Sequence, residues 1–552
     1  MEAKIISSLE KCFLDENIEN KPQLESFSML KNERYSFCVC FFDSEAKMDW
    51  SKQTLRFRLE GDFKDCANVY KVGHIPSNLP CYPDHCDDNY LRKTPGLYPD
   101  LLEPIGEETR LPAVRYLQTL WIELEPDGKL NAGDYLIEGA FVNEAGEEKA
   151  RVSVKAEIID ALLPPQEITY AQWFYTDCLM QYYEVETWSE KHWEIIENFL
   201  RNASRYGQNM ILTPLLTPEL DTYVGGYRPT TQLVDITLEN GEYVFDFSRV
   251  KRWVETCQRA GMKYFEINHF FSQWGAKFCP QVVAKVEGEE KRIFGWEDAS
   301  DSDRYLDFLR ALIPAFIDYM KSLGVDKLCR FHVSDEPSPE NLELYKKVSS
   351  VVKSLIKDCG TMDAASNYEF YRTGAIEYPI PCNDHMDDFI KYGVKELWTY
   401  YCCAQCVDVS NRFFAMPSAR NRIIGTQCYK YGVQGFGHWG YNFYNNQLSY
   451  APINPFLCSD AECSFPSGDA YSVYPGRGGQ PWPSLRQIVF YDALQDMRAM
   501  QLCEELYGKD YVISLIEDGI EPITFKKYPH SAEYLLNLRE RINKAIKEKG
   551  ED

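Results

Sequence analysis

From about residue 166 onward, short apolar segments alternate with helical patterns, and this alternation is the strongest constraint on the fold. Eight segments have the length and composition of buried strands: Ala171–Tyr175, Gln208–Thr213, Lys263–His269, Cys329–Val333, Thr361–Ser366, Ile380–His385, Glu396–Tyr401 and Val433–Trp439. Strands that alternate with helices are typical of parallel sheets. Eight such units predict a (β/α)8 barrel of the TIM type, closed by C-terminal helices at about 484–507 and 531–548.

Helical patterns follow the first four strands at 189–202, 248–260, 302–322 and 342–356. Ser189 is the predicted N-cap of the first helix, and the second and third helices are expected to begin at Ser248 and Ser302. Two long inserts, Pro214–Val244 and Phe270–Ser300, separate the second and third strands from their helices. We expect both inserts to be long loops.

Residues 1–165 have a different pattern, with few helical signals. Five segments have the length of a strand and are either continuously apolar or alternate between apolar and polar residues: Tyr35–Phe42, Thr54–Leu59, Gln118–Leu124, Asp134–Val142 and Lys149–Ile158. Short strands separated by turn signals predict a β-sandwich. Leu162-Leu-Pro-Pro165 marks the boundary between a sandwich domain, 1–165, and a barrel domain, 166–552. Within the first domain, Tyr90–Pro104 is too rich in proline for a core strand and predicts a long ordered loop.

Charge and cysteine usage narrow the classes of partner. The net charge of −25 disfavours nucleic acid and anionic membranes, because neither would be attracted. The 19 cysteines lack the spacing of a disulfide scaffold, and we find no apolar leader or 18-residue apolar run. These features predict a reduced, cytoplasmic protein with no membrane segment. Cys403 and Cys406 form a C-x-x-C without a second pair, which favours packing over zinc; no metal or cofactor is expected.

Two adjacent carboxylates, Asp335 and Glu336, follow the fourth predicted strand. Pro337 helps to end that strand, and Ser338-Pro339 has the pattern of an N-cap and first helical position. In an α/β barrel this end of a strand carries the chemistry. Like charges so close raise the pKa of one group, which leaves an acid able to donate a proton near neutral pH. The competing interpretation is an ordinary acidic loop that caps a helix.

Other polar and aromatic residues fall at the same predicted ends. They are Asp177, Thr213, His269, Gln273, Trp274, Asp384, His385, Trp398, Tyr400, Trp439, Tyr441 and Asn442. Any one aromatic residue alone would be assigned to core packing. Together, carboxylates ringed by tryptophan and tyrosine are typical of a sugar pocket, in which rings stack and polar groups fix hydroxyls. The predicted partner is therefore a glycan or oligosaccharide substrate; homo-oligomerisation remains open.

Several motifs stand out along the chain: Ser334-Asp-Glu-Pro337, Gly437-His-Trp-Gly-Tyr-Asn-Phe-Tyr444, Phe465-Pro-Ser-Gly-Asp-Ala470 and Tyr474-Pro-Gly476, with Gly96–Leu102 and Asn131–Tyr135 in the N-terminal domain. Together these motifs resemble glycoside hydrolase family 123. The resemblance covers most of the chain from about residue 90. The Asp-Glu-Pro motif is moderately specific, and it becomes more so together with the Trp-x-Tyr-Asn block that follows.

The resemblance implies an exo-acting, retaining β-N-acetylgalactosaminidase that uses substrate-assisted catalysis through an oxazolinium intermediate. Asp335 would orient the acetamide N–H, and Glu336 would be the general acid and then the base. Trp398, Tyr400, Trp439 and Tyr441 would line the sugar subsite, with His385 and Asn442 as further hydroxyl contacts. An intracellular enzyme of this kind would meet imported short oligosaccharides.

Three alternatives follow from the residues. One is a glycosidase for sugars without an acetamido group, with Asp177 or Asp384 as nucleophile. Another is a carbohydrate-binding or scaffold protein without catalysis, against which the intact Asp335–Glu336 pair counts. A metal-dependent hydrolase is least favoured, because no His or Asp spacing resembles a ligand set.

Overall fold

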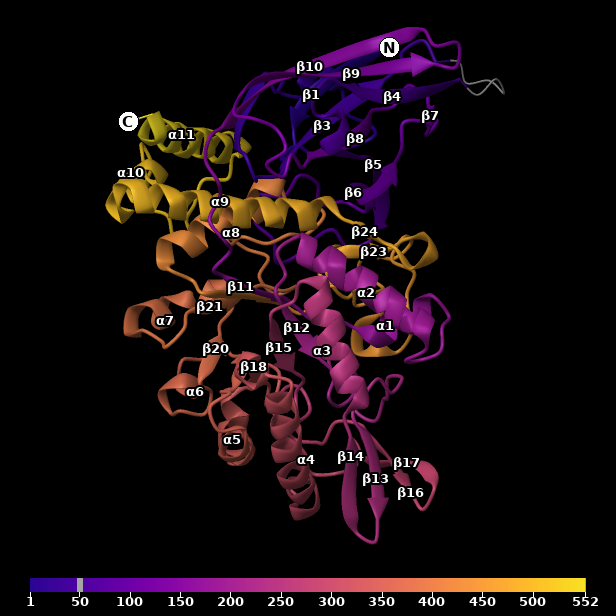
Figure 1. Cartoon of the computed structure of the whole chain (residues 1–552), viewed down its shortest axis with the longest axis vertical. Coiled ribbons are helices and arrows are strands. Elements are labelled where there is room, and N and C mark those ends of the chain that lie inside the picture. Colours follow the sequence, from indigo (N-terminus) through magenta and orange to yellow (C-terminus); the bar gives the residue numbers. More distant parts are fainter. Residues whose placement is uncertain (47–52, 552) are drawn as a thin grey trace. The chain divides into compact units, whose positions relative to one another are not determined.

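The computed structural model describes residues 1–46 and 53–551, and the chain divides into two compact units (Figure 1). The first unit comprises Met1–Gln166, Cys406–Lys430 and Trp482–Asp552, and the second comprises Glu167–Gln405 and Tyr431–Pro481. The end of the first segment lies next to the boundary expected at residue 165. Two later segments group with the N-terminal one, so neither unit is a single stretch of chain.

Two five-stranded sheets make up the N-terminal segment of the first unit. One has the order β1 (Glu2–Ser7), β3 (Tyr35–Phe42), β8 (Gln118–Leu124), β5 (Ala67–Ser77), β6 (Gly96–Ile105). The other has the order β2 (Ser26–Leu30), β10 (Glu148–Ile159), β9 (Gly133–Asn143), β4 (Thr54–Glu60), β7 (Leu111–Pro112). Apolar side chains from both sheets share one buried core. All five strands predicted here are confirmed to within one residue at each end.

The predicted loop at 90–104 is wrong over its second half, where β6 forms. Proline is tolerated there because β6 is an edge strand, paired only with β5, and needs no second row of amide donors. The register shifts where Pro99 lies opposite His74, so that Asp100 is the extra residue. The Asp100 carboxylate is buried and accepts a 2.7 Å bond from Arg486 Nε.

Parallel strands form the centre of the second unit. Six pair in the order β18 (Cys329–Phe331), β15 (Tyr264–Ile267), β12 (Met210–Thr213), β11 (Thr169–Gln172), β22 (Gly435–His438), β21 (Trp398–Tyr400). A further parallel pair is β19 (Met362–Ala364) with β20 (Tyr378–Ile380). Parallel bridges Phe331–Thr361 and Cys382–Tyr400 link this pair to β18 and β21, so each of these eight strands has two parallel neighbours.

The strand expected at 380–385 is displaced, because β20 ends at Ile380. Asn383–His385 forms a 3-10 turn instead. Asn and Asp side chains compete with a sheet for backbone hydrogen bonds, which explains why a polar run ends a strand rather than extending it.

Helices follow the parallel strands. Their bounds are α1 (Thr176–Tyr182), α2 (Glu190–Arg205), α3 (Ser248–Ala260), α4 (Asp303–Ser322), α5 (Leu342–Ile356), α6 (Glu369–Arg372), α7 (Met386–Tyr392), α8 (Ser418–Tyr431), α9 (Leu485–Tyr507), α10 (Lys509–Ile516) and α11 (Ala532–Glu551). The Ser189 side chain caps α2 as predicted, and the side chains of Ser302 and Ser484 cap α4 and α9 in the same way. Ser248 is the first residue of α3 rather than its cap. Ser338 makes no capping bond, because a 3-10 turn at Pro339–Asn341 precedes α5.

The two long inserts are not plain loops. They form a four-stranded sheet in the order β14 (Glu242–Asp246), β13 (Asp235–Glu239), β16 (Val282–Val286), β17 (Glu289–Phe294), labelled in Figure 1. Each insert supplies one hairpin, and β13 pairs with β16 in parallel. Two further short strands are β23 (Val473–Pro475) and β24 (Pro481–Pro483). Within residues 1–46 and 53–551, no helix has the length and hydropathy needed to cross a membrane.

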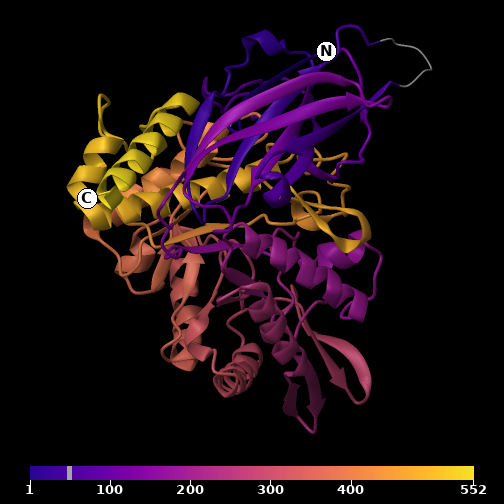
Figure 2. The same cartoon turned by 45° about the horizontal axis from the view of Figure 1, so that its top comes forward.

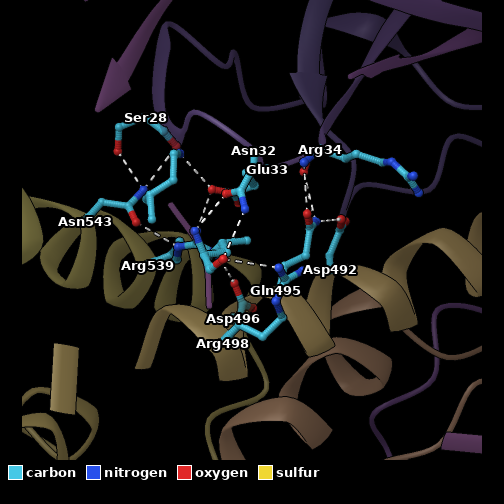
Figure 3. A network of polar contacts seen from close by, with 12 residues as sticks. Ser28, Asn32, Glu33, Arg34, Asp492, Gln495, Asp496, Arg498, Arg539 and Asn543 are labelled. Carbon is cyan, nitrogen blue, oxygen red and sulfur yellow. Dashed lines mark hydrogen bonds and ion pairs between the residues drawn. The ribbon is translucent and has the colours of Figure 1, made fainter. Parts of the chain in front are cut away.

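A buried polar network joins the C-terminal helices of the first unit to its N-terminal strands (Figure 3). Helices α9 and α11 lie side by side (Figures 1 and 2). Arg539 on α11 donates to Glu33 at 2.6 Å and to Asp496 on α9 at 2.9 Å, and all three side chains are buried. Asn543 reaches the backbone of Ser28. The linearly distant segments of this unit are therefore held together by buried ion pairs.

Replacement of Arg539 by methionine should lower the stability of this unit strongly. The change leaves the Glu33 carboxylate buried without its cation, a loss of about 3–5 kcal/mol for a broken buried pair. Arg541→Met is the matched control, because Arg541 lies on the same helix and pairs with Asp518 at the surface, where a pair contributes about 0–1 kcal/mol. Thermal melting of both variants checks the expectation. Equal melting temperatures would contradict it.

Candidate active site

A pocket opens at the carboxyl ends of the parallel strands of the second unit. It contains residues from the ends of β11, β15 and β19 to β22 and from the turn after β18. Its empty volume is about 830 Å³, part of it open to solvent. Of the predicted site residues, the ones that line it are Trp274, Asp335, Glu336, Trp398, Tyr400 and Trp439.

The backbone after β18 turns both adjacent carboxylates into this pocket. Neighbours in a regular strand point to opposite faces, but Glu336 has a φ of 41°, in the left-handed region. A non-glycine residue there costs about 1–3 kcal/mol and persists only when its surroundings hold it. Ser334 Oγ donates to the Ser272 carbonyl at 2.8 Å, and the Asp335 carbonyl accepts from Trp274 N–H at 2.8 Å. These bonds fix the two residues that precede Glu336 and so support its strained conformation.

The two carboxylates have different environments. Burial, and then the charge of Glu336, raise the pKa of Asp335 well above its usual range. Glu336 is the more exposed residue, and its Oε1 accepts a hydrogen bond from the Tyr400 hydroxyl. Burial raises the pKa of Tyr400 as well, so its hydroxyl keeps the proton that it donates. One carboxyl is thus biased towards the protonated form, and the other is oriented by a fixed donor.

Removal of the Tyr400 hydroxyl should slow turnover by roughly 10- to 100-fold, because a hydrogen bond to a charged group contributes about 1.5–3 kcal/mol. Tyr400→Phe keeps the ring that lines the pocket and deletes only the donor to Glu336. Tyr264→Phe is the control, since Tyr264 begins β15 at the opposite end of the strands. Steady-state kinetics on a β-N-acetylhexosaminide check this. Unchanged kcat in Tyr400→Phe would remove the hydroxyl from the mechanism.

A chain of buried groups lies behind the carboxylate pair. His332, next after β18, places Nε2 2.6 Å from Glu266 Oε1 and Nδ1 2.9 Å from Asp363 Oδ1. Trp173 Nε1 also donates to Glu266, at 2.9 Å, and the Tyr345 hydroxyl donates to Asp363. Burial alone would lower the pKa of His332, but the two carboxylates outweigh it and raise the pKa to about 10. A buried imidazolium therefore lies between two carboxylates.

His269 does not line the pocket as a hydroxyl ligand. Its ring is buried and stacks on His332 with centroids 4.2 Å apart. Burial, and then the charge of His332, lower the pKa of His269 well below its usual range, so this ring is neutral. The predicted sugar contact for His269 is replaced by packing against the imidazolium.

The side chains behind the pocket fit a metal ion poorly. His269, His332 and Asp363 bring potential ligand atoms within 4.8 Å of one another. Both ring nitrogens of His332, however, already bond to carboxylates, and a protonated imidazole has no lone pair for a metal. The second cluster of this kind among residues 1–46 and 53–551 is Cys382, Asp384 and His385, which contains neither Cys403 nor Cys406.

Two predicted sugar contacts, Tyr441 and Asn442, lie outside the pocket. The buried Tyr441 hydroxyl donates to the Phe199 carbonyl at 2.9 Å. Asn442 bonds through both ends of its amide to the backbone of Tyr175, at 2.9 Å each. Both residues hold the segment after β11 against the segment after β22.

Asp177 and His385 also lie away from the pocket walls. Asp177 is buried in an ion pair with Arg228, at 2.7 Å. His385 is exposed, bonds to Asp384 at 2.6 Å, and lines a second hollow beside the pocket. These two side chains are therefore not positioned to contact a sugar within the pocket.

Several pocket residues were not predicted as sugar contacts: Trp173, Asp221, Glu266, Cys402, Cys403, His438 and Phe465. Burial raises the pKa of Asp221 to about 6, although the Leu448 N–H and Arg228 act in the opposite direction. Gln273, recognised only as a strand-end residue, also lines the pocket. The sequence signal that could have identified one of them is a charged residue inside an apolar strand, as Glu266 is in β15.

Comparisons with known proteins agree with this geometry. The model of the glycoside hydrolase 123 catalytic domain matches residues 173–503, more than half of the chain. A solved family 123 glycoside hydrolase from Clostridium perfringens, described for glycolipid glycan hydrolysis, shares 13% identity with a TM-score of 0.75, covering 100% of this chain and 98% of that one. At this identity the likeness shows the fold alone.

Two other solved structures are more distant. An endo-β-1,4-mannanase from Thermotoga petrophila has 12% identity and a TM-score of 0.34, covering 61% of this chain and 78% of that one. A family 5 mannosidase from Rhizomucor miehei has 10% identity and a TM-score of 0.36, covering 65% and 96%. TM-scores below 0.5 do not establish a shared fold, so neither likeness bears on this chain. No curated protein matches. With its carboxylate pair inside the matched region, the chain belongs to glycoside hydrolase family 123 and is a glycoside hydrolase.

Proposed function

We propose that this glycoside hydrolase removes terminal β-linked N-acetylhexosamine, GalNAc before GlcNAc, with retention and by substrate-assisted catalysis. The carrying observation is that Asp335 and Glu336, adjacent in the chain, both line one pocket with Trp398 and Trp439. A pair so close suits an acid and a helper better than two groups that flank a bond from opposite sides. The aromatic side chains supply faces on which a sugar ring stacks.

Glu336 acts as the general acid in this proposal. It is the more exposed of the two carboxyls, and Tyr400 fixes its orientation. Glu336 gives its proton to the glycosidic oxygen as the bond to the anomeric carbon breaks. It then takes a proton from the water that opens the intermediate.

Asp335 acts on the acetamido group. The acetamide oxygen attacks the anomeric carbon and forms an oxazolinium ion, so no protein nucleophile is needed. Asp335 as a carboxylate accepts the N–H and stabilises the positive charge that develops on the ring. The raised pKa of Asp335 means that this charge is disfavoured in the empty site. Binding of an N–H donor reverses that preference.

Release of p-nitrophenol from the β-GalNAc, β-GlcNAc and β-Gal glycosides tests the proposal. Cleavage confined to the two N-acetyl sugars is the expected result, with GalNAc faster. Cleavage of the β-Gal glycoside at a similar rate would reject substrate assistance. If none of the three glycosides is cleaved, the assignment shifts to an enzyme that requires a more specific glycan, or to carbohydrate binding without catalysis.

One observation favours a second candidate, a glycosidase with its own nucleophile. Asp221 lines the same pocket as Glu336, and burial raises the pKa of Asp221 to about 6. Asp177 and Asp384, the nucleophiles expected for this alternative, do not line the pocket. In the second candidate, Asp221→Asn abolishes turnover and a fluorinated glycoside labels Asp221 covalently.

Activity should fall as the pH is lowered through the pKa of Asp335. The proposal requires ionised Asp335, and burial with the Glu336 charge raises its pKa. The acid limb of kcat/KM therefore lies well above the roughly 3.9 of a free aspartate. A pH profile measured for the wild type and for Tyr264→Phe checks this. An acid limb at or below that value would contradict ionisation of Asp335 as the controlling step.

We also infer the finer architecture. The eight parallel strands, each with two neighbours, support a closed (β/α)8 barrel. The two N-terminal sheets with a shared core support a β-sandwich.

A further inference from the structure

Two adjacent cysteines, Cys402 and Cys403, form part of the pocket wall and take no part in the chemistry described above. Both line the pocket that contains Asp335 and Glu336. Both are half-buried, and neither is in a disulfide. The Cys402 thiol donates a hydrogen bond to the Cys403 sulfur. We call these two residues the pocket dithiol.

A tight turn fixes the position of the pocket dithiol. The Cys402 carbonyl accepts from the Gln405 N–H at 3.2 Å, which closes a turn over residues 402–405. The buried Gln405 Oε1 accepts from the Cys402 N–H at 3.0 Å and is a second acceptor for the Cys402 thiol, at 3.3 Å. Cys402 is therefore anchored from behind, with Cys403 beside it at the pocket surface.

The two sulfurs of the pocket dithiol differ in reactivity. The hydrogen bond to Cys403, then burial and the charge of Cys403, raise the pKa of Cys402 well above its usual range. Cys402 therefore keeps its proton, and the pair carries its first negative charge on Cys403. Thiolates rather than thiols attack disulfide bonds. Cys403 is thus the attacking sulfur, and Cys402 is in place to react second.

We propose that the pocket dithiol is an oxidation site, at which a low-molecular-weight disulfide converts Cys402 and Cys403 into a disulfide and thereby inactivates the hydrolase. The inference rests on the proposed function only in placing the reacting sugar in this pocket. A dithiol in an active-site wall then makes hydrolysis depend on the balance of thiols and disulfides around the enzyme.

The oxidation takes two exchange steps. The Cys403 thiolate attacks one sulfur of the compound R–S–S–R, whose S–S bond breaks, so that a Cys403–S–S–R mixed disulfide forms and RS⁻ leaves. This step removes the charge and the hydrogen-bond acceptor that raise the pKa of Cys402. Cys402 then loses its proton, attacks the Cys403 sulfur and expels the second RS⁻. Two cysteines are oxidised, the compound is reduced to two thiols, and the two cysteine protons end on those thiols.

The resulting disulfide is easily reduced. Neighbouring Cα atoms lie about 3.8 Å apart across a trans peptide, closer than the roughly 4.4–6.8 Å of most disulfides. A bond between adjacent cysteines is therefore strained, and strain makes a disulfide more reducible. Excess thiol should return the pair to its reduced form, so the inactivation is reversible.

Oxidation reaches the proposed acid through two residues of chain. Tyr400, whose hydroxyl donates to Glu336, precedes Cys402 by two positions. The Glu336 charge also contributes to the raised pKa of Cys402, which shows that these groups are close. The disulfide draws the Cys402 sulfur away from Gln405 and rearranges the turn. Loss of the Tyr400 bond to Glu336 then lowers kcat/KM by about tenfold or more.

The kinetic test treats the protein with bis(2-hydroxyethyl) disulfide and measures kcat/KM on a glycoside that the wild type cleaves. The wild type should lose about tenfold or more, and dithiothreitol should restore it. Treated Cys403→Ser should keep its own untreated kcat/KM. Cys463→Ser is the matched control, because Cys463 is an exposed cysteine outside the pocket wall, and this variant should be inactivated like the wild type. Inactivation of Cys403→Ser, or full activity of the treated wild type, would overturn the proposal.

Peptide mass mapping separates this proposal from the proposed function, because it needs no substrate. The treated wild type should lose two hydrogens from the peptide that contains Cys402 and Cys403. Treated Cys402→Ser should stop at the mixed disulfide and gain one 2-hydroxyethylthio group on Cys403. Reaction at Cys463 with the pocket dithiol left reduced would overturn the oxidation site even if hydrolysis is as proposed. A Cys402–Cys403 disulfide in a protein that cleaves none of the aryl glycosides would support the site and count against the proposed function alone.

Discussion

Glu336→Gln is expected to lower kcat for a β-GalNAc disaccharide by about 10²- to 10⁴-fold, the range of a positioned general acid. Glutamine keeps the shape of the side chain and an acceptor for the Tyr400 hydroxyl. It has no proton to give to a departing sugar, whose alkoxide is a poor leaving group. With the 2,4-dinitrophenyl β-GalNAc glycoside the loss should be far smaller, because that leaving group needs no proton.

The difference between the two leaving groups is the decisive measurement. Glu340→Gln serves as control, because Glu340 is an exposed glutamate in the 3-10 turn that follows the same strand end. Its kinetics should match the wild type on both substrates. A Glu336→Gln enzyme that lost activity equally on both would have lost substrate positioning rather than an acid.

The parallel strands of the second unit could be predicted because burial on both faces leaves an unmistakable apolar run. Met210–Thr213, inside the predicted strand at 208–213, is such a run, and β12 occupies it. β6 could not be predicted in the same way, since the prolines that argue against a central strand are harmless at an edge. The sheet made by the two inserts depends on pairing between β13 and β16, which are far apart in sequence. Local patterns do not encode such pairing.

The residues of the candidate site also differ in whether the sequence could predict them. Asp335 and Glu336 could be found because two carboxylates at a strand end are conspicuous. The pairing of His332 with Glu266 and Asp363 could not be predicted, because Glu266 and Asp363 lie in two different strands and His332 follows a third. Each looks like an isolated polar residue in an apolar run. Position at a strand end also does not reveal the direction in which a side chain points. Tyr441, for example, is packed against α2 and does not reach the pocket.

The second large effect is expected for Asp335→Asn, with kcat for N-acetylhexosaminides lowered by about 10²- to 10³-fold, the scale of removing one preorganised electrostatic group. The asparagine oxygen can still accept the acetamide N–H, but it carries no charge to stabilise the oxazolinium ion. The substitution should not lower the stability of the folded protein. Because burial raises the pKa of Asp335, ionisation at neutral pH destabilises the native state, and asparagine removes that cost.

Melting temperature and inhibitor binding together isolate this role. Asp335→Asn should melt at or above the wild-type temperature, while Asp326→Asn, in the 3-10 turn that precedes β18, should leave kcat unchanged. A thiazoline analogue of the oxazolinium ion should bind the wild type tightly and bind Asp335→Asn at least tenfold more weakly, since the carboxylate is what holds the ring nitrogen. Wild-type affinity in Asp335→Asn, or a lower melting temperature that accounts for the lost activity, would remove Asp335 from the chemical step. Asp221 would then be the carboxyl to examine, because it is the other aspartate in the pocket.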